Sequence, residues 1–443
     1  MSHVSRLRTF ALMNWIEKDR KYIWHPFTPQ KERLDPIFIE RGKGSLLYDS
    51  EGHAYIDAVS SWWVTLHGHA HPYIAEKLYQ QALELEQVIF AGFTHKPAIE
   101  LAERLVTLLP QNFTRIFYSD NGSTSTEVSL KMAIQYWWNQ AYENGVHKGI
   151  KRNKIIAFKN SYHGDTFGAM SVSDRGVFTM AFHDLLFEVL FIDTPEKDNI
   201  KQTKALLEEY GHEVAAFIYE PLVQGAGGMK MYDAALLDEL LGIMQETGII
   251  CIADEVMTGF GRTGKLFASE HMQHKPDIIC LSKGLTGGTM ALGVTACSDK
   301  IYNAYVNDDK LKTFFHGHSF TANPLACTAA IASLDLVKQN NVIEKIEWLT
   351  AQHQLFAAKL AAREAKGFSV KNIRTQGTII AFEIDKGKDE YLNNISQEIT
   401  QKCMAKGVYI RPLGNAVYLM PPYCITQEEL NTIYETLLSV LND

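Results

Sequence analysis

The chain has 443 residues, of which 46% are hydrophobic and 21% charged, with 30 glycines and 13 prolines. This composition is typical of a globular protein and excludes a disordered, collagen-like or coiled-coil chain. Lys and Arg number 43 against 51 Asp and Glu, which gives a formal net charge of −8. We therefore expect no nucleic-acid or membrane partner, because general binding to either needs a basic surface.

The six cysteines are far apart and form no CxxC pair, so we expect neither a disulfide framework nor a metal site. The N-terminal residues contain no sustained apolar segment, and no run reaches the ~18 apolar residues that a membrane-spanning helix requires. These features predict a cytoplasmic protein.

The first 70 residues are rich in Gly, His and Trp, and residues 44–59 have the pattern of a short hairpin. We expect residues 1–70 to join a smaller domain that is formed mainly by the C-terminal part. From about residue 330 the chain becomes rich in helical patterns, with strand candidates at 377–384 and 407–413. Residues 331–443 are therefore predicted to form this smaller α+β domain.

Residues 71–330 alternate short apolar runs with helical patterns, for example at 125–138 and 235–246. The runs are apolar throughout and rich in β-branched side chains, which favours parallel strands covered on both faces. We therefore predict a large, doubly wound, mostly parallel α/β domain. The expected strands are 115–119, 154–158, 215–220, 249–255, 277–282 and 292–298.

Two of these expected strands end in residues that could form one site. One apolar run ends at Asp254, and another leads directly into Lys283. Taken alone, Asp254 fits a helix cap or a loop carboxylate, and Lys283 fits an exposed lysine in a turn. Ligands of open α/β sheets bind beyond the carboxyl ends of the strands, so neighbouring strands would bring a carboxylate and a nucleophilic amine together.

Two further segments also follow strand ends. Gly122 and Ser123 begin an amphipathic helix whose free N–H groups could bind a phosphate, although Gly and Ser are also ordinary capping residues. Tyr162 and His163 could stack on a planar ligand or pack within a loop. Together the four segments predict a site for a planar, phosphorylated cofactor with a cationic ring. Pyridoxal phosphate meets all of these requirements.

The chain resembles the class III, fold-type I pyridoxal-phosphate aminotransferases over nearly its whole length. This resemblance implies the fold-type I architecture, a transamination reaction and a homodimer with shared active sites. It is carried by IWHPFT (23–28), SSWW (60–63), SYHGDTFGAMS (161–171), EPLVQGAGGMKMY (220–232), ADEVMTGFGRTGKLFA (253–268), LSKGLTGGTMALG (281–293), HGHSFTANPLAC (316–327) and GVYIRPLGNAVYLMPPY (407–423).

The resemblance also implies a role for each matching residue. Lys283 would bind the cofactor covalently and move a proton, and Asp254 would hold the pyridine nitrogen. The phosphate would lie between Gly122 and Ser123 of one subunit and His318 and Ser319 of the other. The residues implied in substrate binding are Trp62, Tyr162, Lys283, Gly317 and Arg411, and Phe27, Trp63, Asp165, Arg262 and Tyr418 are further candidates.

Together, the motifs SSWW, QGAGGM, KGLTGGTM and YLMPPY resemble a narrower branch of the class, which aminates 8-amino-7-oxononanoate in biotin biosynthesis. That branch implies S-adenosylmethionine as the amino donor. Glutamate-coupled members commonly have polar residues where this chain has Ala226 and Met257, and their loss suits a long, mostly apolar acceptor. Phe27 and the pair His318 and Ser319 depart from the usual family motifs, which leaves lysine as an alternative donor.

Two other functions compete with this interpretation. One is a different class III enzyme, such as an ω-amino-acid or diamine aminotransferase or a glutamate-semialdehyde aminomutase. The other is a non-enzymatic protein that binds a nucleotide in the sheet crevice. SSWW, Met257 and Arg411 argue against the first, and Lys283 at a strand end argues against the second.

Overall fold

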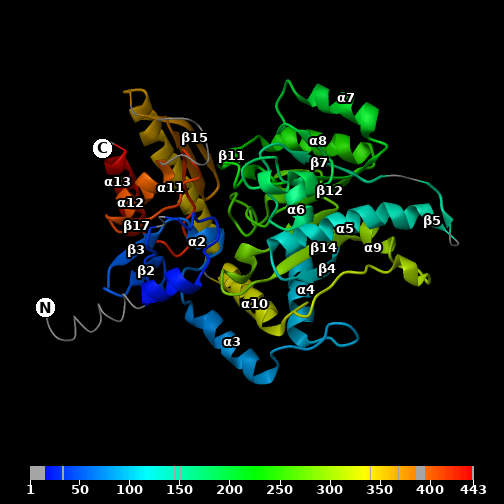
Figure 1. Ribbon diagram of the computed structural model, residues 1–443, viewed down its shortest axis with the longest axis horizontal. Helices are drawn as coiled ribbons and strands as arrows, with labels where there is room; N and C mark the ends of the chain where they lie inside the picture. The colour runs from blue at the N-terminus through cyan, green and yellow to red at the C-terminus, as the bar shows by residue number, and fades with distance from the viewer. Residues whose placement is uncertain are drawn as a thin grey trace.

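A seven-stranded sheet forms the centre of the larger part of the molecule (Figure 1). The structure is a computed structural model that describes residues 15–31, 34–143, 146–149, 152–339, 341–367, 369–385 and 395–441. The strand order is β4 (Phe113–Ser119), β14 (Gly293–Ser298), β13 (Ile278–Leu281), β12 (Ile250–Asp254), β9 (Val214–Tyr219), β7 (Lys154–Phe158) and β8 (Val189–Ile192).

All neighbouring strands of this sheet are parallel except those that pair with β14, which is antiparallel to both β13 and β4. The mostly parallel sheet is therefore confirmed, but the assignment of 292–298 as a parallel strand is wrong. All six residues of β14 are buried, so the strand lacks the polar alternation that would have marked its direction. The sequence pattern also does not predict β8, an edge strand of four residues.

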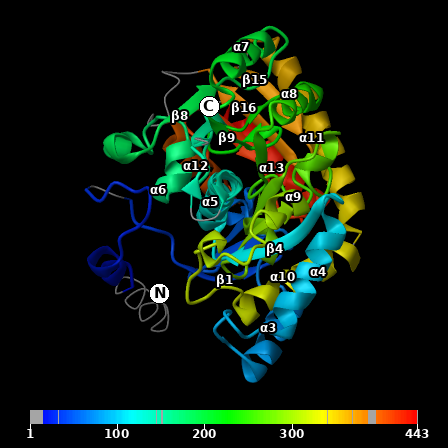
Figure 2. The same ribbon diagram turned by 90° about the vertical axis from the view of Figure 1, so that its right-hand side faces the viewer.

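Helices cover both faces of the sheet, as Figures 1 and 2 show. Successive residues of β12 point to opposite faces, so Ile250 and Ile252 enter one core and Cys251 and Ala253 the other. The first core is completed by α5 (Gly122–Ala141), α6 (Phe167–Val172) and α9 (Asp299–Asn303). The second core is completed by α4 (Lys96–Leu108), α7 (Ile200–Tyr210) and α8 (Ala234–Glu246).

The N-terminal and C-terminal segments combine in the smaller part of the molecule, where blue strands lie beside orange and red elements in Figure 1. One sheet has the order β1 (Ile39–Lys43), β2 (Leu46–Asp49), β3 (Ala54–Asp57) and β17 (Val408–Tyr409), and the expected hairpin is β2–β3. A second sheet contains β15 (Val370–Gln376), β16 (Ile379–Ile384) and β18 (Ala416–Leu419), and the helices are α11 (Val342–Glu364), α12 (Ile395–Met404) and α13 (Gln427–Val440).

The predicted domain boundary near residue 330 lies inside α10 (Pro324–Gln339). This helix packs against α3 (Pro72–Glu84) and α4, whereas α11 packs against β15 and β16. The domain boundaries stay a prediction.

The remaining short elements are α2 (Ser60–Trp63), β5 (Tyr142–Glu143), β6 (Val146–His147), η1 (Met180–Leu185), β10 (Val223–Gln224), β11 (Lys230–Met231), η2 (Ala268–His271), η3 (Lys283–Thr286) and η4 (Lys310–Lys312). Within the described ranges, no helix has the length and apolar character to cross a membrane.

Candidate active site

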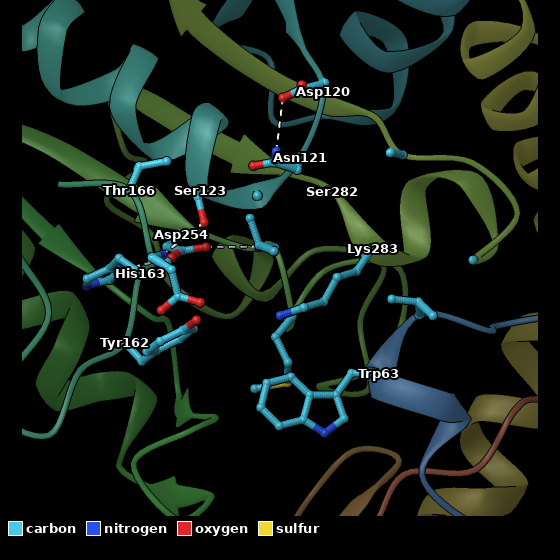
Figure 3. A pocket seen from close by; sticks show the side chains of 18 of the residues that line it. Trp63, Asp120, Asn121, Ser123, Tyr162, His163, Thr166, Asp254, Ser282 and Lys283 are labelled. Carbon is cyan, nitrogen blue, oxygen red and sulfur yellow. Dashed lines mark hydrogen bonds and ion pairs between the residues drawn. The ribbon is translucent and has the colours of Figure 1, made fainter. Parts of the chain in front are cut away.

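A cavity of about 640 Å³ lies beyond the carboxyl ends of β7, β9, β12 and β13. Figure 3 shows Lys283 extending into this cavity, with Trp63 on one side and Asp254 across from it. Because β12 and β13 are adjacent parallel strands, their ends meet at one edge of the sheet. The predicted proximity of Asp254 and Lys283 therefore rests on neighbouring strands, as expected.

A buried histidine fixes the orientation of Asp254. The Oδ2 atom of Asp254 lies 2.7 Å from Nδ1 of His163, and its Oδ1 accepts a hydrogen bond of 3.1 Å from the backbone N–H of Val256. Nε2 of His163 has no hydrogen-bond partner among the described residues. The sequence pattern indicated His163 only as an aromatic ring at a strand end, because the pairing joins residues 91 positions apart.

The backbone and the burial of Lys283 both favour a reactive amine. Its φ of +43° lies in the left-handed region that L residues rarely adopt, and such strain is typical of functional sites. Its Nζ lies 4.6 Å from the ring centroid of Trp63 and has no hydrogen bond or ion pair within the described part of the chain. Burial lowers the pKa of Lys283, against the opposing effect of Asp254 and Glu220. A lowered pKa leaves more of the amine neutral and nucleophilic.

Glu220 is a second carboxyl group in this cavity, and the sequence interpretation gave it no role. Its two carboxylate oxygens accept the backbone N–H groups of Tyr162 at 3.0 Å and Gly225 at 2.9 Å. The residue is only 5% exposed, and burial raises the pKa of Glu220 to about 7. Glu220 follows an apolar strand just as Asp254 ends one, so the same sequence signal could have found it.

The N-terminus of α5 forms the opposite wall of the cavity. Asn121 and Thr124 form a reciprocal capping box that fixes where the helix begins. The backbone N–H groups of Gly122 and Ser123 have no acceptor among the described residues, as expected for the first helical turn. A Cβ atom on Gly122 would lie 2.7 Å from Cγ1 of Val256, so a larger residue there would force Val256 or the helix start to shift. The arrangement suits an anion, because free N–H groups and the helix dipole both favour negative charge.

The two tryptophans of SSWW are adjacent in the sequence, but a left-handed turn places their side chains in different environments. Asp57 accepts the backbone N–H of Ser61 at 2.7 Å and contacts Nε2 of His69 at 2.9 Å, and these contacts hold the left-handed turn in α2. As a result Trp63 is 4% exposed and lines the cavity, whereas Trp62 is 40% exposed and does not. Nε1 of Trp63 donates a 2.8 Å hydrogen bond to the hydroxyl of Tyr418, which places Tyr418 behind the cavity wall.

Trp62 belongs to a neighbouring cluster of aromatic rings. The ring centroids of Phe27 and Trp62 are 5.5 Å apart, and Phe178 links Phe27 to Tyr162 at 5.9 Å and 5.8 Å. The guanidinium carbon of Arg411 lies 4.7 Å from the ring centroid of Trp62. Because Tyr162 lines the cavity itself, the cluster connects Arg411 and Trp62 with the cavity.

The other candidates lie in different places. Asp165 lines the cavity and donates its backbone N–H to Oγ of Ser123. Arg262 is fully buried elsewhere, and its Nη1 donates to the backbone oxygen of Pro421 at 3.0 Å. Residues 317–319 do not line the cavity of their own chain.

The glycines that follow Lys283 allow close packing of the chain. A Cβ atom on Gly284 would lie 3.0 Å from the side chain of Leu66, and one on Gly287 would lie 2.9 Å from His67. These two glycines therefore allow η3 to pack against the segment that follows SSWW, whereas the next glycine, Gly288, lines the cavity.

The family model "Aminotransferase class-III" matches residues 27–441. The chain belongs to the class-III aminotransferases. This class-III aminotransferase is 46% identical to the adenosylmethionine-8-amino-7-oxononanoate aminotransferase of Synechococcus elongatus, with 95% of this chain and 99% of the relative covered.

Two solved structures support the same family and the fold-type I architecture. The enzyme of the same name from Methanocaldococcus jannaschii is 35% identical, with a TM-score of 0.89 and coverage of 96% of this chain and 99% of that one. A PLP-bound amine transaminase from an uncultivated Pseudomonas species is 30% identical, with a TM-score of 0.87 and coverage of 95% and 98%. Family membership and the PLP-bound neighbour imply pyridoxal phosphate (PLP) as the cofactor of this class-III aminotransferase.

Proposed function

We propose that this chain is a PLP-dependent aminotransferase that converts 8-amino-7-oxononanoate to 7,8-diaminononanoate in biotin biosynthesis, with S-adenosylmethionine as the amino donor. The observation that carries the proposal is the position of the Lys283 amine. It has no hydrogen-bond partner among the residues that the structure describes, and it faces the Asp254–His163 pair across one cavity. The choice of acceptor and donor rests on the names of relatives that are 36–46% identical over nearly the whole chain.

The residues of the cavity fit a phosphorylated pyridine aldehyde. The N–H groups of Gly122 and Ser123 would bind the phosphate. The absence of a Cβ atom on Gly122 lets this helix start pack closely against Val256. Asp254 would bind the ring nitrogen, with its orientation fixed by His163. The lowered pKa of Lys283 suits an amine that must attack an aldehyde.

When bound, PLP supplies an electron sink for the substrate carbon that loses its proton. Lys283 would take that proton and return it, because its side chain reaches the cavity. Its amine is also not held by a hydrogen bond or an ion pair to any other residue that the structure describes. Tyr162 would form one side of the space in which the substrate reacts, and Trp63 would exclude water from the other side. Arg411 would bind the acceptor's carboxylate, because a guanidinium group suits two parallel hydrogen bonds.

We also propose a homodimer in which Gly317, His318 and Ser319 complete the site of the partner subunit. These residues lie outside the cavity of their own chain, and Phe315 and Phe320 beside them are 70% and 62% exposed. Large apolar side chains in such a position are typical of a protein–protein interface. A cytoplasmic location is proposed because all six cysteines are free, as in reducing compartments.

A coupled assay with purified 8-amino-7-oxononanoate tests this function. S-adenosylmethionine and lysine are offered separately, and formation of 7,8-diaminononanoate is measured. We expect turnover with S-adenosylmethionine; turnover with lysine alone would show that only the donor was wrong, and turnover with neither would refute the function.

Substitution of Lys283 tests the role of the amine. Lys283→Ala should reduce kcat by at least about 10³-fold, because the same amine is proposed both to bind the cofactor covalently and to move the proton. It should also remove the absorbance band of covalently bound cofactor. Lys77→Ala, which removes an exposed lysine of α3, is the matched control. Full activity of Lys283→Ala would refute the assignment.

A further inference from the structure

A second cavity of about 550 Å³ lies beside the first, and Tyr162 lines both of them. Its walls come from both parts of the molecule. The larger part contributes the residues after β7, Asp174, residues 176–178 and Gly228, and the smaller part contributes the tight turn 413–416. Within this turn Leu413 and Ala416 exchange backbone hydrogen bonds of 2.9 Å and 3.0 Å, which gives the cavity a fixed wall on that side.

The polar groups of this second cavity include acceptors with capacity to spare. The carboxylate of Asp174 accepts the backbone N–H groups of Asn160 at 2.6 Å and Arg175 at 2.7 Å, one on each oxygen. Each carboxylate oxygen can accept two hydrogen bonds, so Asp174 can still bind hydroxyl groups. Lys230 donates to Oδ1 of Asn160 at 2.8 Å, and Glu383 forms an ion pair of 3.2 Å with Arg374.

These groups fit a nucleoside better than an anion. The rings of Tyr162 and Phe178 supply an aromatic wall, against which a planar base can stack. A carboxylate is a common partner of ribose hydroxyl groups, and the amides of Asn160 and Asn415 offer further polar contacts. Glu383 is paired with Arg374, but the carboxylate of Asp174 would repel the acceptor's own carboxylate, and Arg411 lies outside this cavity.

We propose that the second cavity binds the adenosine portion of the amino donor, and this inference rests on the proposed function. The first cavity must hold the cofactor together with the reacting end of either substrate. S-adenosylmethionine carries a nucleoside beyond its amino-acid portion, whereas 8-amino-7-oxononanoate and lysine carry none. The second cavity is therefore a subsite for the donor alone.

Filling the second cavity should weaken only the donor half of the reaction. Val177 lines this cavity and is 43% exposed, so Val177→Trp adds bulk there without disturbing a buried core. We expect the KM for S-adenosylmethionine to rise by about tenfold or more, with the acceptor half-reaction changed by less than about twofold. Ile343→Trp is the matched control, because Ile343 is also β-branched, is 69% exposed and does not line the cavity.

Binding of methylthioadenosine, measured by calorimetry on the holoenzyme, tests the subsite without turnover. The wild type should bind it, and both Val177→Trp and Gly176→Trp should bind it at least about tenfold more weakly. Gly176 provides a second variant because no heavy atom lies within 4 Å of a Cβ atom at that position. Equal effects on both half-reactions, or unchanged binding in both variants, would overturn the subsite. A wild type that aminates 8-amino-7-oxononanoate but does not bind methylthioadenosine would overturn the subsite and leave the proposed function standing.

Discussion

Single residues around Lys283 set the charge of the cavity. Glu220 and Asp254 are both buried carboxyl groups near the amine, but their environments differ. Asp254 contacts a histidine ring nitrogen, whereas among the described residues the carboxylate of Glu220 accepts only two backbone N–H groups. Desolvation is therefore the main influence on Glu220 and favours its neutral form.

The raised pKa of Glu220 predicts a pH dependence of stability. The pKa rises from an ordinary 4.5 to about 7 in the folded protein, so the folded state binds the extra proton between these values. Stability of the cofactor-free protein should therefore fall as pH rises from about 5 to about 7, with a slope of at most about 1.4 kcal/mol per pH unit for this group. Urea denaturation at a series of pH values measures this slope.

Glu220→Gln should flatten part of that slope. The remaining slope is expected from Glu255, whose pKa burial also raises to about 7. Glu84→Gln, on the exposed surface of α3, is the control and should leave the slope as it is in the wild type. An unchanged slope in Glu220→Gln would show that Glu220 does not titrate in this range.

Among the elements, α5 contributes to the site through its first turn, which lines the cavity. The capping box of Asn121 and Thr124 fixes the first turn, and Gly122 allows that turn to approach Val256. The backbone N–H of Val256 in turn donates to Asp254, so the start of α5 and the Asp254 carboxylate are connected through Val256. A small shift of the helix start would disturb both groups.

Gly122→Ala tests this connection. The added Cβ atom would lie 2.7 Å from Cγ1 of Val256, so the helix start or Val256 must move. We expect the Kd for PLP to rise by about tenfold and the free energy of unfolding to fall by about 1–3 kcal/mol. Cofactor titration and denaturation measure the two effects. Gly176→Ala has open space at its Cβ position and should change neither; a wild-type Kd in Gly122→Ala would contradict the close approach.

In the whole molecule, the proposed dimer distributes each active site over two chains. Lys283 and the start of α5 line one cavity, whereas Ser319 lies outside it and is exposed. A homodimer of 50.0 kDa chains should have a mass of about 100 kDa by light scattering. An active monomer would refute the shared site.

Mixed dimers give a sharper test of the shared site. Ser319→Glu should impair the enzyme, because a carboxylate would repel the phosphate of the partner's cofactor. After random exchange with Lys283→Ala chains, half of the dimers are mixed and each of these has one intact site, so about a quarter of wild-type activity should return. No recovery, or full activity of Ser319→Glu alone, would contradict the arrangement.

The family, most of the sheet and the proximity of Asp254 and Lys283 could all be predicted from the sequence alone. Apolar strands that end in Asp254 and Lys283 are local patterns, and the edge at which such strands end is a general property of α/β sheets. The direction of β14 was not determined, because a strand buried on both faces lacks polar alternation whichever way it runs.

The contacts between distant parts of the chain could not be predicted from the sequence and became visible only in the folded structure. It paired His163 with Asp254, placed Glu220 against the backbone of Tyr162, and turned Trp63 inward while leaving Trp62 exposed. It also enclosed a second cavity between the two parts of the molecule. Such contacts depend on how elements pack over long sequence separations, and local hydrophobic periodicity carries no information about that packing.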